Sequence, residues 1–312
     1  MKSRPKQSIC EQIAIMKSNG VKFDLITENE AARYLEYNTY FFKVKAYDIL
    51  FEKYQTGEKK GQYLNLDFAY LKELSIIDMH LRHFLLNTCV DVEHAIKVTL
   101  MRDFNNSSSD GYDIVDKYFT AYPDVREELM KKKGNSYSSD LITKLETEGY
   151  ALWNIIEVIS FGNFIQLYDM FYQTYPECQT GINYTYPMRN IKNLRNAAAH
   201  NNCIIDQLCK ELSDNRKENR KITSYVVKIP GITRDMRRTM MKHRVIHDFA
   251  TLLYIIDTAI DSPGIKSHLI ESLDQLVNER MIRHKDYFTK NNTLMASYHF
   301  IKLMVDNMKK TR

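Results

Sequence analysis

The chain is poor in the residues that form turns and disulfide frameworks. Only 10 of its 312 residues are glycine and 6 are proline, which disfavours a loop-rich β protein. The cysteines are odd in number and include no Cys-x-x-Cys pair, so neither a disulfide scaffold nor a zinc knuckle is expected. They are Cys10, Cys89, Cys178, Cys203 and Cys209. A reducing cytosol is the simplest setting for this pattern, so we expect a cytoplasmic protein.

Membrane-spanning and leader patterns are also missing from the sequence. No run of 18 apolar residues is present, and Met1 to Pro5 leads into an amphipathic stretch without the apolar centre of a signal peptide. We therefore expect a soluble protein with no membrane partner.

The usual signatures of cofactor and metal chemistry are absent as well. The chain contains no P-loop motif, no Gly-x-Gly-x-x-Gly fingerprint after a strand and no Gly-x-Ser-x-Gly elbow. His243 and His247 are spaced for one helical face, as are His80 and His83, but neither pair has an evident third ligand. We predict no cofactor and no bound metal.

Helical spacing is present over most of the chain, which is long enough for one large domain or two smaller ones. This spacing predicts helices over residues 9–19, 67–104, 150–175, 187–200, 232–262, 264–283 and 291–309. Thr27 and Glu30 form a capping-box pattern that starts a further helix, whereas residues 224–229 are predicted to be a short extended piece. We expect an all-α fold with an N-terminal helical region (1–62) and a helical domain (63–312).

Aromatic side chains are concentrated between residues 38 and 54. They are Tyr40, Phe41, Phe42, Tyr47, Phe51 and Tyr54. A packed helical hairpin is the simpler interpretation, because apolar stripes at helical spacing usually face a core. A surface on which RNA bases stack is the alternative.

The stretch from Arg195 to His200, Arg-Asn-Ala-Ala-Ala-His, is the one most suggestive of chemistry. Pro187 suits the first turn of its helix, and the asparagines at 201–202 suit its end. Asn196 and His200 share a helical face, whereas Arg195 and His200 point about 140° apart. The helix must therefore fray near His200, or a second copy must supply the complementary group. A permanent cation beside a group that moves protons near neutral pH suits a phosphodiester substrate.

This Arg-x4-His pattern, with asparagine directly after the arginine, resembles the catalytic motif of the HEPN superfamily. Active members of that superfamily are metal-independent endoribonucleases that work as dimers or paired domains. Two further stretches, 153–164 and 29–47, taken in this order resemble the Abi-like (AbiD/AbiF) abortive-infection proteins of bacteria. The resemblance covers about residues 10–210. It implies a HEPN-like helical bundle with an N-terminal helical extension and additional C-terminal helices.

Glu157 lies within a strongly apolar stretch, where an ionised carboxylate is costly without a partner. It either sits on the polar edge of its helix or is held by a cation such as Arg195. The resemblance favours the second interpretation, because it places this helix beside the motif helix. In that role Glu157 would orient Arg195 or tune His200.

Two oppositely charged pairs lie at i,i+4 spacing on the helix predicted over 67–104. They are Asp78 with Arg82 and Glu93 with Lys97. Such pairs contribute only a few tenths of a kcal/mol on a helix surface. We interpret them as a solvated face, with a direct role in the site as the alternative.

Positive charge is concentrated after the motif. The chain has a net charge of +5, yet residues 214–247 carry ten lysines and arginines against three acids, a net of +7, which leaves the remainder at −2. Beside a candidate nuclease motif, this basic block is interpreted as a phosphate track, with a solvated linker as the alternative. The candidate RNA-binding side chains are Arg189, Lys192, Arg234, Arg237, Arg238 and Lys242.

Together these features predict a metal-independent endoribonuclease that acts as a homodimer. His200 would help transfer protons, Arg195 would stabilise the charge on phosphorus, and Asn196 would position His200 or the phosphate. The resemblance implies products with 2′,3′-cyclic phosphate and 5′-hydroxyl ends and a role in antiphage abortive infection. RNA is the expected partner. The nuclease must be restrained in healthy cells, and either an RNA bound to the basic block or an inhibitory protein could restrain it. The alternative function is a non-catalytic RNA-binding or protein-interaction module with the same helical fold.

Overall fold

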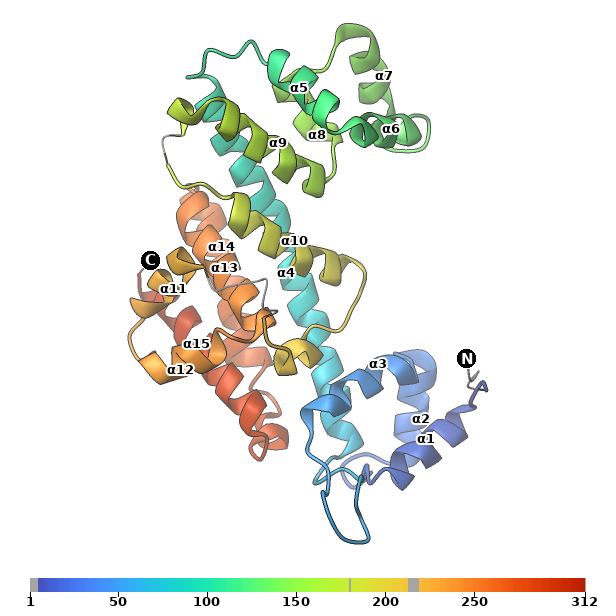
Figure 1. The fold of residues 1–312 in the computed structure, drawn as a ribbon. Coiled ribbons are helices and arrows are strands. Elements are labelled where there is room, and N and C mark those ends of the chain that lie inside the picture. The colour runs from blue at the N-terminus through green and yellow to red at the C-terminus, as the bar shows by residue number, and fades with distance from the viewer. Residues whose placement is uncertain (1–4, 180, 213–218, 312) are drawn as a thin grey trace. The chain divides into compact units, whose positions relative to one another are not determined.

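The computed structural model describes residues 5–179, 181–212 and 219–311. The regular structure in these ranges is helical, with fifteen α-helices, short 3-10 and π turns, and β pairing limited to three isolated bridges (Figure 1). The predicted all-α fold is confirmed. The described ranges contain no helix with the length and apolar content needed to cross a bilayer.

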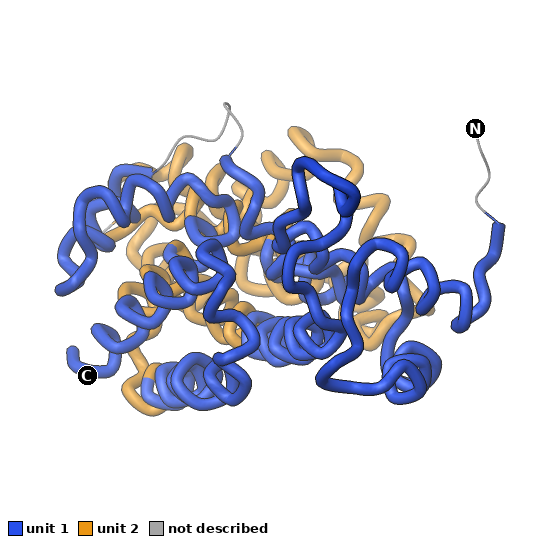
Figure 2. The backbone as a smooth tube through the Cα atoms, turned by 90° about the horizontal axis from the view of Figure 1, so that it is seen from below, with its two compact units in different colours: residues 1–87, 194–250, 267–312 blue, residues 88–193, 251–266 orange. Residues whose placement is uncertain are grey.

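The chain forms two compact units, which Figure 2 shows in different colours. Unit 1 comprises residues 1–87, 194–250 and 267–312, and unit 2 comprises residues 88–193 and 251–266. Each unit is therefore assembled from stretches that are far apart in the sequence. The boundary predicted at residue 62 lies inside unit 1, and the division into 1–62 and 63–312 stays a prediction.

Unit 1 begins with short helices, and side-chain caps set the starts of the first two. They are α1 (Ile9–Ser18), α2 (Glu28–Tyr37), α3 (Phe41–Lys45) and the 3-10 turn η1 (Ala46–Leu50). The Thr27 hydroxyl accepts a hydrogen bond from the Glu30 amide at 3.2 Å, and the Glu30 carboxylate accepts one from the Thr27 amide at 2.8 Å. The predicted capping box and the helix predicted over 9–19 are both confirmed.

The long helix α4 (Phe68–Phe104) confirms the helix predicted over 67–104, and its residues are shared between the two units. The carboxylate of Asp67 accepts a hydrogen bond from the Ala69 amide at 2.8 Å and so caps the start of the helix. Within unit 1, α4 carries two buried carboxylates, Glu73 and Asp78. Glu73 is paired with Arg280, which lies on the π-helical turn η4 (Gln275–Arg280).

The remainder of unit 1 comes from the chain after residue 193. Its elements are the end of α10 (Thr185–Ala199), η3 (Ile205–Cys209), α11 (Arg220–Val227), α12 (Arg234–Met240), the start of α13 (Arg244–Ala259), most of α14 (Pro263–Asp274), η4, η5 (Lys285–Phe288) and α15 (Asn292–Lys310). The helical character predicted for 232–262, 264–283 and 291–309 is confirmed, with a break between α12 and α13. Fully buried side chains in unit 1 include Tyr47, Leu66, Phe68, Leu71, Leu85 and Phe300.

Unit 2 is a smaller helical assembly with an aromatic core. It contains the end of α4, α5 (Asp113–Ala121), α6 (Pro123–Lys132), α7 (Ser139–Glu148), α8 (Leu152–Val158), α9 (Phe161–Thr174), η2 (Pro176–Cys178), the start of α10 and the end of α13. Its fully buried rings are Tyr118, Phe164, Tyr168 and Phe171. The Tyr172 hydroxyl donates to the Asp103 carboxylate at 2.8 Å and ties α9 to α4.

Two elements differ from those predicted. The helix predicted over 150–175 is two helices, α8 and α9, because the Ser160 hydroxyl accepts a hydrogen bond from the Asn163 amide at 3.2 Å and caps a new helix. The piece at 224–229 that was predicted to be extended is mostly part of α11, where the buried side chains of Ile222 and Val226 are one turn apart. Burial on one helical face therefore outweighs the β preference of this segment.

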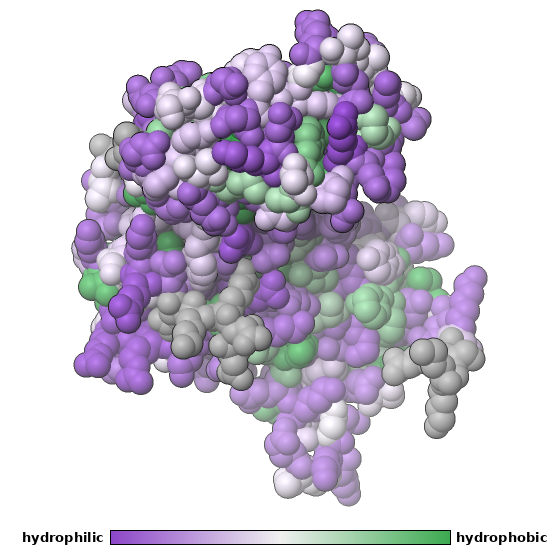
Figure 3. All heavy atoms as spheres, turned by 45° about the horizontal axis from the view of Figure 1, so that its top comes forward, coloured by the Kyte–Doolittle hydropathy of each residue, from purple (hydrophilic) through white to green (hydrophobic). Residues whose placement is uncertain are grey.

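The aromatic stretch at 38–54 is divided between core and surface. Tyr47 is fully buried, whereas Tyr40 and Phe42 are 58% and 80% exposed. The packed-hairpin interpretation therefore holds for Tyr47 and not for the other two. The molecular face drawn in Figure 3 is mostly hydrophilic, with hydrophobic side chains in scattered patches.

An ion pair between Asp274 on α14 and Lys309 on α15 should make the stability of the fold depend on pH. Lys309 donates to Asp274 at 2.6 Å, and Asn278 donates to its second oxygen at 2.7 Å. The bond from Lys309, followed by that from Asn278, lowers the pKa of Asp274 below its usual range. A carboxyl with a lowered folded-state pKa stabilises the fold above its unfolded pKa, and that stability is lost as pH falls through the folded value.

We expect Asp274→Asn to reduce the loss of stability that the wild type undergoes between about pH 6 and about pH 3. Urea unfolding at the two pH values measures this loss. Glu271→Gln, an exposed acid on the same helix, is the matched control and should keep the wild-type dependence. An Asp274→Asn variant with the full wild-type pH dependence would contradict the assignment.

Candidate functional site

The motif helix α10 ends one residue before His200, and Pro187 lies in its first turn as predicted. Asn201 has a left-handed backbone, with a φ of 55°. Its amide bonds to the Ala198 carbonyl at 3.0 Å, and the next amide closes onto the Ala197 carbonyl at 2.8 Å. These two bonds form a Schellman ending in which asparagine occupies the position usually held by glycine. The end predicted at residues 201–202 is confirmed.

Two of the three predicted motif side chains contact each other. Arg195 is half-buried, and its Nη1 donates to Asn196 Oδ1 at 3.2 Å. His200 is exposed at the end of the helix. The His200 amide still bonds to the Asn196 carbonyl at 2.9 Å, as in the helix, so His200 and Arg195 stay about 140° apart around the helix axis. The second predicted route, in which a partner copy completes the pair, stays a prediction.

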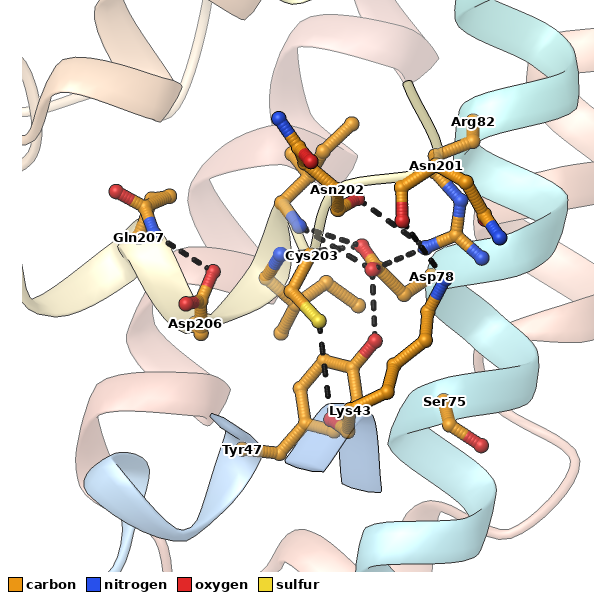
Figure 4. Close-up of polar contacts among 12 residues, drawn as sticks. Lys43, Tyr47, Ser75, Asp78, Arg82, Asn201, Asn202, Cys203, Asp206 and Gln207 are labelled. Carbon is orange, nitrogen blue, oxygen red and sulfur yellow. Dashed lines mark hydrogen bonds and ion pairs between the residues drawn. The ribbon is translucent and has the colours of Figure 1, made fainter. Parts of the chain in front are cut away.

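Asp78 on α4 anchors the chain that follows the motif (Figure 4). It is fully buried, and its carboxylate accepts hydrogen bonds from the Tyr47 hydroxyl at 2.7 Å and from the Arg82 guanidinium. It also accepts backbone amide bonds from Ile204 at 3.2 Å and from Ile205 at 3.1 Å. Burial raises the pKa of Asp78, and the Tyr47 bond and the charge of Arg82 oppose that rise.

Two cations hold the carbonyl groups of the same loop. Lys43 Nζ donates to the Asn201 carbonyl at 2.8 Å, and Arg82 donates to the Asn202 carbonyl at 3.5 Å (Figure 4). Burial of Lys43 lowers its pKa, and the nearby charge of Arg82 lowers it further. The loop after His200 is thus held through its carbonyls by cations and through its amides by a carboxylate. We name the four side chains that hold it, Lys43, Tyr47, Asp78 and Arg82, the Asp78 clamp.

The clamp shows that the solvated-face interpretation of Asp78 and Arg82 is wrong. The Asp78 side chain is 0% exposed and that of Arg82 is 6% exposed. Their partners in the loop after the motif lie more than a hundred positions further along the chain, so the spacing of the two residues within one helix cannot reveal these contacts. The second pair, Glu93 with Lys97, is a half-buried contact at 3.1 Å.

Three of the predicted site residues belong to unit 2. Glu157 is exposed on α8, so its carboxylate is solvated there. Arg189 is paired with Asp169 at 3.1 Å. Lys192 lies against Gly162, where an added Cβ would be 3.6 Å from its Nζ. The roles predicted for these residues at the motif, including the pairing of Glu157 with Arg195, stay predictions.

The basic block is tied within unit 1 to the chain that leads from the motif. The Leu212 amide bonds to the Lys242 carbonyl at 2.7 Å, and the Arg244 amide bonds to the Lys210 carbonyl at 3.0 Å. Arg234, Arg238 and Lys242 are exposed, and Arg237 is half-buried. Residues 214–218 of the block lie outside the described residues.

A metal centre has no candidate ligand set in the part of the chain that the structure describes. No group of three or more histidine, cysteine, aspartate or glutamate side chains is arranged there to hold an ion. His243 and His247 therefore stand as a pair without a third ligand of this kind in those ranges.

The chain is thus an all-α protein in which buried charged side chains hold the loop at 201–205, directly after the end of α10. The profile of the Abi-like protein family matches residues 33–206, more than half of the chain. The chain belongs to this family, which points to a role in abortive-infection defence. No curated protein and no solved structure is detectably similar to it.

The family match includes the whole of the clamp and the motif. It begins ten residues before Lys43 and ends one residue after Ile205, whose amide bonds to Asp78. It therefore spans Arg195, Asn196 and His200 as well. The basic residues of α12 and the helices that follow lie beyond the matched range.

Loss of the Asp78 carboxylate should cost far more stability than loss of a second carboxylate on the same helix. We expect Asp78→Ala to destabilise the protein by about 3–5 kcal/mol, because it leaves Arg82 buried without a counter-charge. Glu93→Ala removes a half-buried i,i+4 pair from α4 and should cost at most about 1 kcal/mol. Urea unfolding of both variants measures the difference, and equal costs would contradict the clamp.

The left-handed backbone at Asn201 gives a second prediction. Asn201→Gly should retain wild-type stability, whereas Asn201→Val should lose at least about 1–2 kcal/mol, because a β-branched side chain is strained at positive φ. Asn202→Val, one position later, is the matched control. Thermal unfolding separates the three variants, and equal effects at 201 and 202 would refute the assignment.

Proposed function

We propose that the protein is a metal-independent endoribonuclease of the HEPN type that acts in abortive infection in the cytoplasm. The observation that carries this proposal is the exposed His200 at the end of α10, on a backbone that the Asp78 clamp fixes. Arg195, whose side chain is half-buried and bonded to Asn196, lies five residues earlier on α10. The family match supports the defence role and covers all of these residues.

The proposed reaction is transesterification of RNA. The ribose 2′-oxygen attacks the adjacent phosphorus and gives up its proton, while the bond from phosphorus to the 5′-oxygen breaks and that oxygen takes up a proton. His200 moves these protons, since imidazole exchanges protons near neutral pH. Arg195 stabilises the extra negative charge on phosphorus, and Asn196 positions His200 or the phosphate. The products carry 2′,3′-cyclic phosphate and 5′-hydroxyl ends.

The active form in this proposal is a homodimer with the two motif helices at a two-fold axis. Each protomer contributes Arg195 and His200 to one shared cleft, which overcomes the divergence of the two side chains on a single helix. The three arginines of α12 (Arg234, Arg237 and Arg238), together with Lys242, Arg189 and Lys192, bind the phosphates of the RNA. Glu157 orients Arg195 or tunes His200. A regulatory RNA or an inhibitory protein restrains the enzyme in healthy cells.

We expect Arg195→Ala and His200→Ala each to lower RNA cleavage at least about 100-fold, because each removes a group needed in the transition state. His268→Ala, which removes an exposed histidine elsewhere in unit 1, is the matched control. Growth on induction and sequencing of cellular RNA ends measure the effect in cells. With purified protein, cleavage should persist in excess EDTA, and DNA should resist it.

Co-expression of Arg195→Ala with His200→Ala tests the shared cleft. Partial return of cleavage is expected if the two groups act from different protomers, and none is expected if they act from one. Unchanged cleavage by His200→Ala would reject the mechanism, as would activity that EDTA abolishes and a divalent ion restores. RNA binding without cleavage by the wild type, with affinity unaffected by His200→Ala, would favour the non-catalytic module instead.

A further inference from the structure

Three aromatic side chains are exposed where α2 ends and α3 begins. Tyr37 is 74% exposed, Tyr40 58% and Phe42 80%, whereas Tyr47 of the same stretch is fully buried. No side-chain hydrogen bond or ring contact holds any of the three in the part of the chain that the structure describes. Single exposed apolar side chains are common on protein surfaces, but several together mark an interaction surface. We name Tyr37, Tyr40 and Phe42 the aromatic patch.

The inward side of α3 is already filled, so Phe42 cannot turn into the core. Lys43 and Val44, which follow Phe42, are both buried. Lys43 Nζ holds the Asn201 carbonyl at 2.8 Å (Figure 4). Because successive residues point about 100° apart on a helix, turning Phe42 inward would take Lys43 away from that carbonyl. The contact that holds the motif loop therefore also keeps the Phe42 ring in solvent.

The start of α3 lies beside the loop that follows His200, and both belong to unit 1. Besides the bond from Lys43 to Asn201, Cys203 Sγ donates to the Lys43 carbonyl at 3.7 Å. Phe42 precedes Lys43, and His200 precedes Asn201, each by one step of about 3.8 Å between Cα atoms. An RNA strand with a phosphate at His200 is therefore within a few nucleotides of the Phe42 ring.

We propose that the aromatic patch is a stacking platform for unpaired RNA bases, which makes single-stranded RNA the substrate class of the site. Every base has a flat face, so exposed rings bind single strands with little preference for sequence. Bases within a duplex are already stacked on one another and do not reach the rings. The segment 37–42 contains rings, an asparagine and a threonine but no aliphatic side chain, which favours flat bases as the partner. The identity of the ligand rests on the proposed function, whereas stacking can be measured without cleavage.

Fluorescence anisotropy with a labelled, mixed-sequence single strand of about 12 nucleotides tests the platform. RNA is used with His200→Ala protein, which should leave it intact, and DNA of the same sequence is used with the otherwise wild-type protein. In both settings Phe42→Leu should weaken binding about tenfold, because leucine is apolar but has no ring. Phe42→Tyr should bind as tightly as the parent. Tyr137→Ala, which removes an exposed ring of unit 2, is the matched control.

Two further measurements separate stacking from other causes. All variants should keep the parent's melting temperature, since the altered side chains are exposed. Stacking releases no counterions, so Phe42→Leu should leave the slope of log affinity against log salt concentration unchanged. Arg238→Gln, which removes a proposed phosphate contact, should make that slope shallower by about 0.7. An RNA duplex of the same sequence should bind Phe42→Leu and its parent equally.

The outcomes distinguish the platform from the proposed nuclease. Unchanged single-strand affinity in both Phe42→Leu and Tyr40→Ala would overturn the platform, even for a protein that cleaves RNA. A change in self-association without a change in affinity, measured by analytical ultracentrifugation, would assign the patch to a second copy of the chain and overturn it too. Weaker single-strand binding by Phe42→Leu, in a protein that cuts no RNA, would support the platform and rule out the nuclease.

Discussion

A buried carboxylate needs hydrogen-bond donors in place of water, and the donors that bind Asp78 constrain much of unit 1. Its oxygens accept bonds from Tyr47, from Arg82 and from two successive backbone amides at 204 and 205. These donors come from three stretches of the chain, so one side chain fixes η1, α4 and η3 relative to one another. Removing an ion from water is expensive unless such bonds replace its hydration.

The second buried pair on α4 extends the same principle to the C-terminal part of unit 1. Glu73 lies five residues before Asp78 on α4 and accepts a hydrogen bond from Arg280 at 3.2 Å. Arg280 ends the π-helical turn η4, whose Leu276 and Val277 side chains are buried in unit 1. The first half of α4 therefore carries two carboxylates, each paired with an arginine, and holds the motif loop and the C-terminal helices through them.

Local features of the fold could be predicted from the sequence, and the clamp could not. The capping box at Thr27, the length of α4 and the Asn201 ending of α10 all follow from residues within a few positions of each other. The break at Ser160 was missed because the apolar pattern continues across it. The role of Asp78 was missed because an i,i+4 charge pair has the same spacing on a solvated face as in a core. Two further residues complete the clamp. Tyr47 lies 31 positions before its partner Asp78, and Lys43 lies 158 positions before its partner Asn201.

The discontinuity of unit 1 has a consequence for the order of events during synthesis. The amide of Ile205 is 127 positions after Asp78, so the carboxylate of Asp78 lacks its last donor until the ribosome has made most of the chain. At typical elongation rates this interval is on the order of ten seconds. Throughout that time the nascent polypeptide holds all four side chains of the clamp without the loop that they secure. The arrangement around His200 thus cannot mature until residue 205 of the 312 has been made, and a product truncated before that residue would lack it.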